Sequence, residues 1–327
     1  MKKYIVYIVI GLHLISCSDA KKERAVVVKE EKPLLQAPSF NADSAYAFIK
    51  KQVDFGPRVP NSAEHVAAGD YFVEKFKAYG AEVKEQNFEA TTFDGVNLSL
   101  RNIISSFNPQ ATKRILLATH WDSRPFADKD EHAPNEAMEA ANDGASGVGV
   151  LLEIGRQLSI KMPHVGVDII LFDGEDWGEK YNMRGVPTPE GLSSWWCLGS
   201  QYWSKNKNGY GAYYGILLDM VGARGAQFHI EGLSNRYAPK VVKKIWNTAS
   251  DIGYSNYFIP EKQSEITDDH QFVNEVAKIP MVDIVHYDPN HGYFGDYHHT
   301  HKDNLSLIDK RTLKAVGQTV LTVIFNE

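Results

Sequence analysis

Apolar residues follow two different periods along this chain, and the two kinds of segment alternate. Apolar residues that recur every three or four positions predict helices over 41–53, 62–79, 144–158, 200–205, 236–252, 271–277 and 308–325. Continuous apolar runs, or strict alternation with polar residues, predict strands over 82–88, 96–106, 114–119, 165–172, 213–218, 227–231 and 280–285. The central strands are apolar throughout, which indicates burial on both faces. This order predicts an α/β fold with a mixed, mostly parallel central sheet, helices on both faces and a single domain.

The first residues have a different pattern, which is typical of an export signal. Lys2 and Lys3 precede an apolar run over 4–15, which is too short to span a bilayer and suits the apolar part of a signal peptide. The run ends in Leu14–Ile15–Ser16–Cys17, which resembles a bacterial lipobox, the signal after which a cysteine is freed and lipidated. An ordinary signal peptide and a buried N-terminal strand are the alternatives.

These features predict three parts of the chain. Residues 1–17 form a lipoprotein signal, and residues 18–36, rich in Lys, Glu and Ala, form a flexible tether. Residues 37–327 form the folded domain. We therefore expect a protein held in a bacterial cell envelope by a lipid on Cys17, either periplasmic or associated with the outer membrane.

Composition limits the partners of this domain. The net charge of −6, with no basic stripe to offset it, argues against nucleic acid. The chain has two cysteines, and lipidation of Cys17 would leave Cys197 alone in the folded part. An intrachain disulfide is therefore excluded, and Cys197 is expected to be a small buried residue.

Side chains that can bind a metal follow most of the predicted strands. Ligands of open α/β sheets bind beyond the carboxyl ends of the strands. The candidates at these positions are His120, Asp122, Asp128, Asn142, Asp143, Glu175, Asp176, Asp219, Asp268, Asp269, His270, His286, His298, His299 and His301. Carboxylates mixed with imidazoles are typical ligands of a divalent transition metal, and zinc fits them best.

Several members of this set have more than one interpretation. Glu175 and Asp176 follow the strand over 165–172, where neighbouring side chains point in different directions. One of them can therefore bind a metal while the other transfers protons, although a solvated acidic turn is the alternative. Asp143 is equally suited to cap the predicted helix that begins at residue 144. Asp219 ends an apolar strand, so its carboxylate needs a partner, a metal or an altered pKa.

Five short motifs occur in a fixed order from about residue 41 to the C-terminus. They are His120–Trp121–Asp122–Ser123, Asn142–Asp143–Gly144–Ala145–Ser146–Gly147, Gly174–Glu175–Asp176, Leu218–Asp219–Met220 and His299–Thr300–His301–Lys302–Asp303. In this order they resemble the co-catalytic zinc aminopeptidase family, which includes the animal-type glutaminyl-peptide cyclotransferases (glutaminyl cyclases) as a non-peptidase branch. Asp268–Asp269–His270 and the run 218–223 are similar to the cyclase branch. Three positions depart from it: Asp176 replaces Glu, Thr267 replaces Gln and His298 replaces Trp.

The resemblance implies a role for each site residue. One zinc would be bound by Asp143, Asp176 and His299, with an open position for water or a substrate oxygen. Glu175 would be the acid/base, next to a hydrogen-bonded acidic network of Asp219 and Asp268 in which a proton is shared. The substrate pocket would be formed by Trp177, Trp195, Trp196, Thr267 and His298.

The resemblance also implies the reaction. A zinc-dependent glutaminyl cyclase, an aminoacyltransferase, converts the N-terminal Gln of peptides and proteins to pyroglutamate and releases ammonia, and we expect it to act as a monomer. The rival is a two-zinc aminopeptidase that removes N-terminal residues. In that enzyme His120 and Asp219 would hold a second zinc, Asp143 would bridge the two ions, and Glu175 would activate water.

Overall fold

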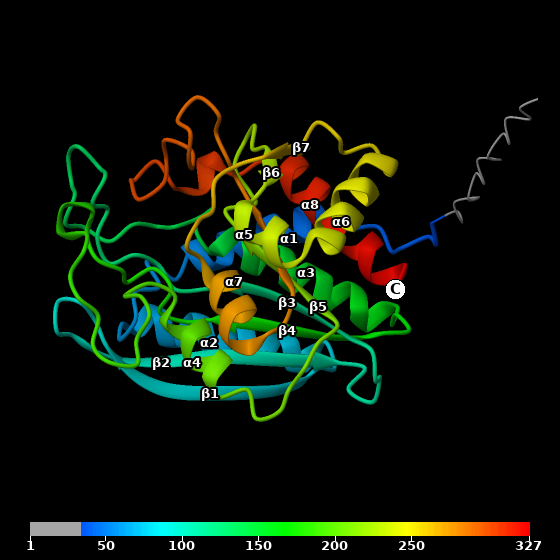
Figure 1. Cartoon of the computed structure of the whole chain (residues 1–327), viewed down its shortest axis with the longest axis horizontal. Helices are drawn as coiled ribbons and strands as arrows, with labels where there is room; N and C mark the ends of the chain where they lie inside the picture. Colours follow the sequence, from blue (N-terminus) through cyan, green and yellow to red (C-terminus); the bar gives the residue numbers. More distant parts are fainter. Residues whose placement is uncertain (1–33) are drawn as a thin grey trace, which may run out of the picture. The chain divides into compact units, whose positions relative to one another are not determined.

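A six-stranded sheet forms the centre of the computed structural model, which describes residues 34–327 (Figure 1). The strand order is β1-β2-β4-β3-β5-β8. The strands are β1 (Glu82–Thr91), β2 (Asn97–Phe107), β3 (Arg114–His120), β4 (Gly166–Phe172), β5 (Tyr214–Asp219) and β8 (Met281–Val285). Strands β4, β3, β5 and β8 are parallel to their neighbours in this order, whereas β2 is antiparallel to both β1 and β4. The predicted mixed, mostly parallel sheet is therefore confirmed.

Helices cover both faces of this sheet. One face carries α1 (Ala42–Val53), α2 (Ala63–Ala78), α3 (Ala145–Ile160), α6 (Pro239–Asp251) and α8 (Lys310–Phe325). The other face carries α4 (Leu198–Lys205), α7 (Asp269–Phe272) and the π-helical turn Val273–Ala277. Helix α5 (Gly232–Tyr237) lies beside β8, and β6 (Phe228–Ile230) pairs with β7 (Phe258–Lys262) in a small separate sheet.

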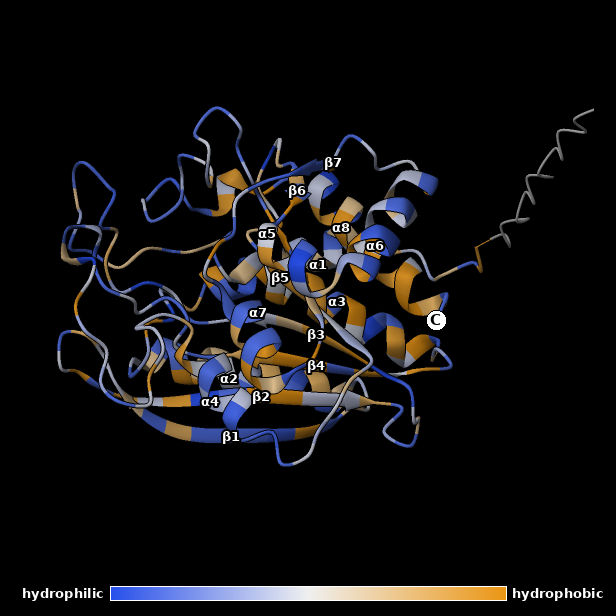
Figure 2. Cartoon of the chain, viewed as in Figure 1, coloured by the Kyte–Doolittle hydropathy of each residue, from blue (hydrophilic) through white to orange (hydrophobic). Residues whose placement is uncertain are grey.

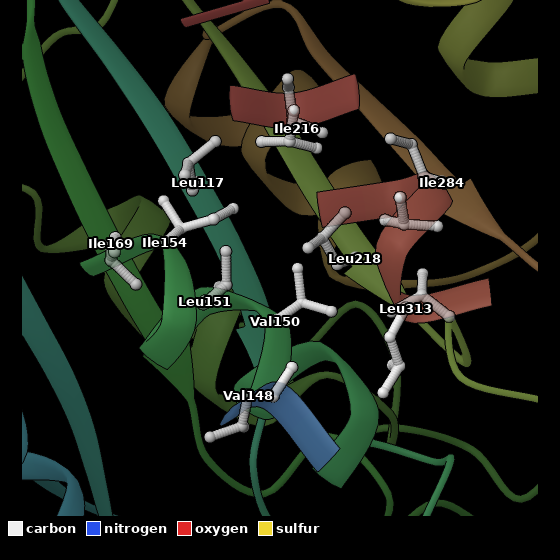
Figure 3. Packing of buried hydrophobic residues seen from close by; sticks show 14 of the residues in the cluster. Leu117, Val148, Val150, Leu151, Ile154, Ile169, Ile216, Leu218, Ile284 and Leu313 are labelled. Atoms are coloured by element: carbon white, nitrogen blue, oxygen red, sulfur yellow. The ribbon is translucent and has the colours of Figure 1, made fainter. Parts of the chain in front are cut away.

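Alternation along the central strands divides the core between these two faces. Ile115 and Leu117 of β3 pack with the helices of the first face, whereas Leu116 and Ala118 pack with the second. Figure 3 shows the first cluster, in which Leu117 and residues from β4, β5 and β8 pack against α3. Figure 2 shows that the central strands are mostly hydrophobic, while hydrophilic residues dominate the edge strand β1. The central strands are thus buried on both faces, and the site lies beyond their carboxyl ends.

Some boundaries differ from the sequence-based expectation for physical reasons. The single helix predicted over 236–252 is two helices, α5 and α6, because Pro239 cannot continue a helix and instead begins the second one. Strand β7 was not predicted. Its sequence, Phe258–Lys262, is mostly exposed and contains a proline, so it lacks the apolar alternation that predicts a strand.

The expected lipobox at Cys17 and most of the expected tether lie outside the described residues. The last tether residues, 34–36, are attached to the domain. The Leu35 amide donates to Asn326 Oδ1 at the end of α8, and Lys161 donates to the Gln36 carbonyl. Among residues 34–327, no helix combines the length and the apolar composition that a membrane crossing needs.

Gly147 is a position at which the fold leaves no room for a side chain. A Cβ at Gly147 would lie 2.6 Å from the Leu218 carbonyl oxygen and would also overlap Thr119 Oγ1. Because α3 packs directly on β3 and β5 here, we expect Gly147→Ala to destabilise the fold by about 1–3 kcal/mol in urea unfolding. Gly211→Ala is the matched control, since nothing lies within 4 Å of its Cβ position. Equal stability of the two variants would contradict this packing.

Candidate active site

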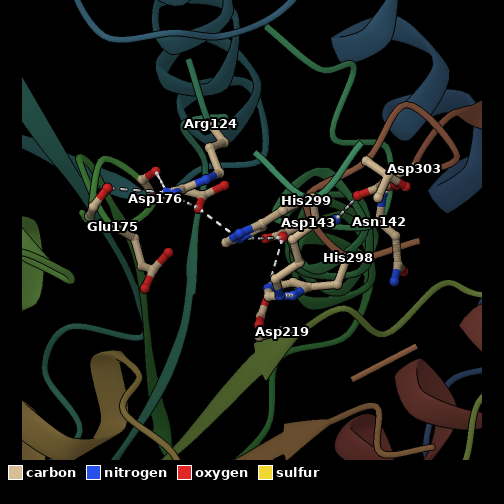
Figure 4. A network of polar contacts seen from close by, with 12 residues as sticks. Arg124, Asn142, Asp143, Glu175, Asp176, Asp219, His298, His299 and Asp303 are labelled. Carbon is tan, nitrogen blue, oxygen red and sulfur yellow. Dashed lines mark hydrogen bonds and ion pairs between the residues drawn. The ribbon is translucent and has the colours of Figure 1, made fainter. Parts of the chain in front are cut away.

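Residues from five parts of the sequence meet at the carboxyl edge of the sheet (Figure 4). His120 ends β3, Asp219 ends β5, and Glu175 and Asp176 follow β4 in the turn after Phe172. Asp143 lies immediately before α3. His298 and His299 come from the segment between β8 and α8. These sequence-predicted metal candidates therefore share one location, as the parallel order β4-β3-β5 requires. The other predicted histidines do not join them: His270 pairs with Glu231, His286 with Tyr297 and His301 with Asp130.

His299 lies beside both Asp143 and Asp176, the two carboxylates that are expected to share a zinc with it. His299 Nε2 lies 3.2 Å from Asp176 Oδ1 and 3.8 Å from Asp143 Oδ2. The other ring nitrogen of His299, Nδ1, lies 3.5 Å from Asp128 Oδ1. Such an outer carboxylate orients an imidazole whose second nitrogen binds a metal.

Within residues 34–327, the Asp176 carboxylate lacks hydrogen-bond donors, which is what a metal ligand would show before its cation is bound. Both of its carboxylate oxygens are buried, and neither accepts a hydrogen bond from any of the described residues. Burial and the neighbouring Asp143 raise the pKa of Asp176, while His299 and Arg124 oppose that rise. A bound cation would compensate both the missing hydrogen bonds and the carboxylate repulsion. The donor set of two carboxylates and one imidazole is one that zinc accepts.

A second set of potential ligands surrounds His120. His120 Nε2 lies 3.0 Å from Asp143 Oδ1 and 3.3 Å from Asp219 Oδ1. These three residues are all buried. The residues that a second zinc would need are therefore also adjacent, so the positions of the side chains do not by themselves set the number of metals.

Two further carboxylates fix the backbone that carries the site. Asp303 accepts hydrogen bonds from the amides of Asn142 and Asp143, at 2.7 and 3.0 Å. Asp122 accepts from the amides of Glu175 and Asp176, both at 3.1 Å. Helix α3 has no side-chain cap at its N-terminus, so Asp143 does not have the capping role that was the alternative interpretation.

Glu175 lies in an environment that raises its pKa and so makes its carboxylate a stronger base. Burial raises the pKa of Glu175 well above its usual range, and Asp176, Asp268 and Asp269 add to this, while His120 opposes it. The Cys197 thiol donates to Glu175 Oε1 at 3.1 Å, and the Cys197 amide donates to the Glu175 carbonyl at 3.0 Å. Cys197 is buried and free, as expected, but it also contacts the site.

Asp219 and Asp268 belong to a larger group of buried carboxylates. Burial raises the pKa of Asp219 to about 7, and nearby Asp268 contributes to the rise. Burial also raises the pKa of Asp268. Asp269 and Asp283 extend the group, and both are buried. So many carboxylates cannot all ionise together in an apolar surrounding, which means that protons are shared among them.

A pocket of about 440 Å³ opens beside these groups. Of the expected pocket residues, Trp196, Thr267 and His298 line it. Trp177 and Trp195 do not. Trp177 packs against Phe88, Leu98, Leu100 and Leu198 in a separate apolar cluster, and the Trp195 indole donates to the Val186 carbonyl in the adjacent loop. The expectation that Trp177 and Trp195 form the pocket is therefore wrong, because their rings pack in neighbouring parts of the fold.

Several functional contacts were missed from the sequence. Arg124 is fully buried, donates to the Asp176 carbonyl at 2.9 Å and pairs with Asp128. Arg58 is also fully buried and donates to the carbonyls of Glu139 and Ala140, at 2.5 and 2.8 Å. Both arginines lie in loops between predicted helices and strands, so the periodicity of apolar residues did not indicate that they are buried. A buried arginine beside a carboxylate-rich site is nevertheless the counter-charge such a site needs.

Arg58 balances the carboxylates beneath the site. Burial lowers the pKa of Arg58 to about 10, although Asp303, Asp122 and Asp143 act to raise it. We expect Arg58→Met to lower the free energy of unfolding by about 3–5 kcal/mol, because it leaves buried carboxylates without a counter-charge. Arg224, which is exposed, is the control, and Arg224→Met should change stability by about 0.5 kcal/mol or less. Urea unfolding of both variants measures the difference, and a small loss at Arg58 would contradict this role.

Comparisons with known proteins agree with this geometry. The glutaminyl-peptide cyclotransferase of Boiga dendrophila is 25% identical over 266 residues, which cover 72% of this chain and 67% of that protein. The crystal structure of Bacteroides thetaiotaomicron glutaminyl cyclase bound to N-acetylhistamine is 49% identical, with a TM-score of 0.85, and the match covers 89% of this chain and 100% of that one. A Zn-dependent exopeptidase from Parabacteroides distasonis is also 49% identical, with a TM-score of 0.86 and the same coverage. The model of peptidase family M28 matches residues 102–324, and the chain therefore belongs to this family.

Proposed function

We infer that this protein is a zinc-dependent glutaminyl-peptide cyclotransferase, which converts N-terminal Gln to pyroglutamate and releases ammonia. The observation that carries this conclusion is the 49% identity with the Bacteroides thetaiotaomicron glutaminyl cyclase over 89% of this chain. Other solved glutaminyl cyclases are similar, among them that of Porphyromonas gingivalis, at 48% identity. The site supports the inference, because an acid/base carboxylate lies next to a set of zinc-binding side chains.

The reaction needs no nucleophile from the protein. The α-amine of the N-terminal Gln attacks its own γ-carbonyl carbon, a C–N bond forms, and the bond to the amide nitrogen breaks to release ammonia. Glu175 accepts the proton that the α-amine loses and donates it to the leaving nitrogen. The pocket beside Trp196 folds the Gln side chain so that amine and carbonyl lie close together, which supplies catalysis by proximity.

We propose that a single zinc is held by Asp143, Asp176 and His299. When bound, it supplies Lewis-acid polarisation of the γ-carbonyl. Asp128 orients His299, and Asp303 and Asp122 hold the backbone on which the two carboxylate ligands lie. Asp219 and Asp268 keep Glu175 in a proton-sharing environment.

The two-zinc aminopeptidase is the second candidate, and the cluster of His120, Asp143 and Asp219 is the observation that favours it. The two enzymes differ in metal content. We expect the purified protein to hold one tightly bound zinc per chain by elemental analysis, and to leave Leu-amide uncleaved. Two tightly bound zincs together with release of leucine would support the aminopeptidase instead.

We propose further that the protein is a monomer, attached to a bacterial cell envelope through a lipid on Cys17. The lipobox-like run that ends at Cys17 supports the anchor. When the full sequence is expressed in bacteria, metabolic labelling with a radioactive fatty acid should label the protein. The Cys17→Ser variant should carry no label and should be released from membranes. Labelling that persists in the Cys17→Ser variant would contradict this anchor.

A further inference from the structure

Five exposed apolar side chains lie at the edge of the sheet where the parallel strands begin, which is the edge opposite the active site. Their exposed fractions lie between 41% and 67%, and they are Leu34, Leu35, Ile160, Met162 and Tyr213. Tyr213 directly precedes β5, and Met162 lies in the segment that leads into β4. Because β4 and β5 are both parallel to β3 and run towards the site, the residues before them lie at the other end of the domain.

Helix α3 gives the distance between the two ends. Asp143 lies just before this helix of 16 residues, and Ile160 is its last residue. At a rise of about 1.5 Å per residue, Ile160 lies about 24 Å from the site. The five exposed side chains are therefore far from the substrate pocket, and the proposed reaction gives them no role.

Contacts at the end of α8 join the first described residues to the end of α3. The Leu35 amide donates to Asn326 Oδ1 at 2.6 Å, and Asn326 Nδ2 donates to the Leu35 carbonyl at 3.2 Å. Lys161, which follows α3, donates to the Gln36 carbonyl at 3.2 Å and lies 5.4 Å from the centre of the Phe325 ring. Figure 1 shows the first described residues next to the C-terminal end of α8. The exposed side chains on either side of Lys161 and those at the start of the described chain are therefore neighbours.

Lysines join Tyr213 to the same surface. Lys113 Nζ lies 4.8 Å from the centre of the Tyr213 ring and donates to Glu327 Oε2 at 2.6 Å. Glu327 lies just beyond the end of α8 and also pairs with Lys244. Two lysines thus balance the Glu327 carboxylate, and Lys161 adds a further positive charge to the surface. The apolar side chains are therefore flanked by cations.

The position of the proposed lipid indicates what covers this surface. Residues 18–33 separate Leu34 from Cys17. A segment of this length spans at most about 55 Å when fully extended, so a lipid on Cys17 holds the domain near the bilayer by this end. Apolar side chains flanked by lysines are the combination that binds the headgroup region of an anionic bilayer. A contiguous exposed apolar surface is also typical of a membrane or protein contact.

We propose that the apolar patch of Leu34, Leu35, Ile160, Met162 and Tyr213 rests on the lipid bilayer and directs the active-site pocket away from it. The orientation rests on the proposed anchor at Cys17 and is independent of the cyclase reaction. The lipid attaches the protein, and the patch fixes its orientation. A pocket directed away from the bilayer receives the N-termini of peptides in the aqueous compartment, not those buried in the membrane.

Binding to vesicles tests the patch without the lipid. A chain of residues 18–327 lacks the lipid and keeps every described residue. We expect it to sediment with vesicles of phosphatidylethanolamine and phosphatidylglycerol, and more weakly at high salt, which screens the lysines. The double variant Ile160→Ser/Met162→Ser should bind about 10-fold less, because it removes apolar surface from the contact.

The double variant Val66→Ser/Val96→Ser is the matched control. Both valines are exposed, at 53% and 36%, and lie outside the patch. This variant should bind vesicles as the wild type does. Both double variants change exposed side chains that do not line the pocket, so their turnover of a Gln-peptide in solution should equal that of the wild type.

Fluorescence quenching tests the orientation of the full, lipidated protein in vesicles. Cys197 is buried, so a cysteine introduced at an exposed position can be labelled selectively. A dye on Met162→Cys should be quenched by lipids that carry a quencher near the headgroup. A dye on Glu190→Cys, in the exposed loop after β4, should be unaffected.

Three results would overturn the proposal: no vesicle binding by residues 18–327, equal binding by the two double variants, or stronger quenching at residue 190 than at residue 162. A dimer in solution that Ile160→Ser/Met162→Ser converts to a monomer would also overturn it, because a second copy would then cover the patch. Vesicle binding by residues 18–327 without a fatty-acid label on the full chain would support the patch and overturn the anchor at Cys17. The two failures are therefore distinguishable.

Discussion

Glu175→Gln is expected to lower kcat for cyclisation of a Gln-peptide by about 10²–10⁴-fold, the range that a general acid/base contributes. The substitution keeps the size of the side chain and its contact with Cys197, but glutamine cannot accept and return a proton. Asp122 holds the Glu175 and Asp176 amides independently of the Glu175 side chain, so the zinc-binding residues should stay in place. We therefore expect unchanged zinc content and a KM within a few-fold of the wild-type value, with turnover measured as ammonia release.

Glu190→Gln is the control for this experiment. Glu190 is exposed in the loop after β4 and does not line the pocket. Glu190→Gln makes the same chemical change at an exposed position, and its kcat should match that of the wild type. A Glu175→Gln enzyme with more than about a tenth of wild-type turnover would show that another group transfers the proton.

Asp143→Ala is expected to remove zinc and turnover together. Asp143 lies near three histidines of the site, with His120 at 3.0 Å, His299 at 3.8 Å and His298 at 3.9 Å. Loss of one of the three proposed ligands also removes Lewis-acid stabilisation worth several kcal/mol, so kcat/KM should fall at least about 10³-fold. Equilibrium dialysis against a zinc buffer, followed by elemental analysis, measures the first effect, and ammonia release measures the second.

Asp128→Asn separates a ligand from the residue that orients it. Asp128 lies 3.5 Å from His299 Nδ1 and pairs with Arg124, but it does not belong to the proposed ligand set. Burial acts to raise the pKa of Asp128, yet hydrogen bonds with His299 and Arg124 outweigh it, so the group stays ionised. We expect zinc affinity to fall only about 10–100-fold in Asp128→Asn. Full zinc binding by Asp143→Ala would contradict the ligand assignment.

The sequence predicted the sheet well because its signals are local. The four parallel strands are mostly apolar, and polar residues of the site end β3 and β5 or follow β4. His120, Asp176 and Asp219 were therefore identifiable before any coordinates. The first residues of α1 and α2 were also predictable, because Asn41 and Ser62 cap the N-termini of these helices with side-chain hydrogen bonds.

The parts that the sequence could not predict depend on contacts between distant residues. Lys129 contacts His298, which lies 169 positions away in the sequence, and no local sequence pattern predicts such a contact. Cys197 and His299 adopt left-handed backbone conformations, with φ of 59° in both, which residues other than glycine rarely do. These conformations are imposed by tertiary packing around the site, as is common at functional positions.

The products formed from a Gln-dipeptide test the central claim most directly. The zinc-loaded protein should release one ammonia for each pyroglutamyl-dipeptide formed, at a rate well above that of spontaneous cyclisation, and should yield no free glutamine. An aminopeptidase would instead hydrolyse the peptide bond and release glutamine without ammonia. Free glutamine as the main product would contradict the assignment of this M28 family member as a glutaminyl cyclase.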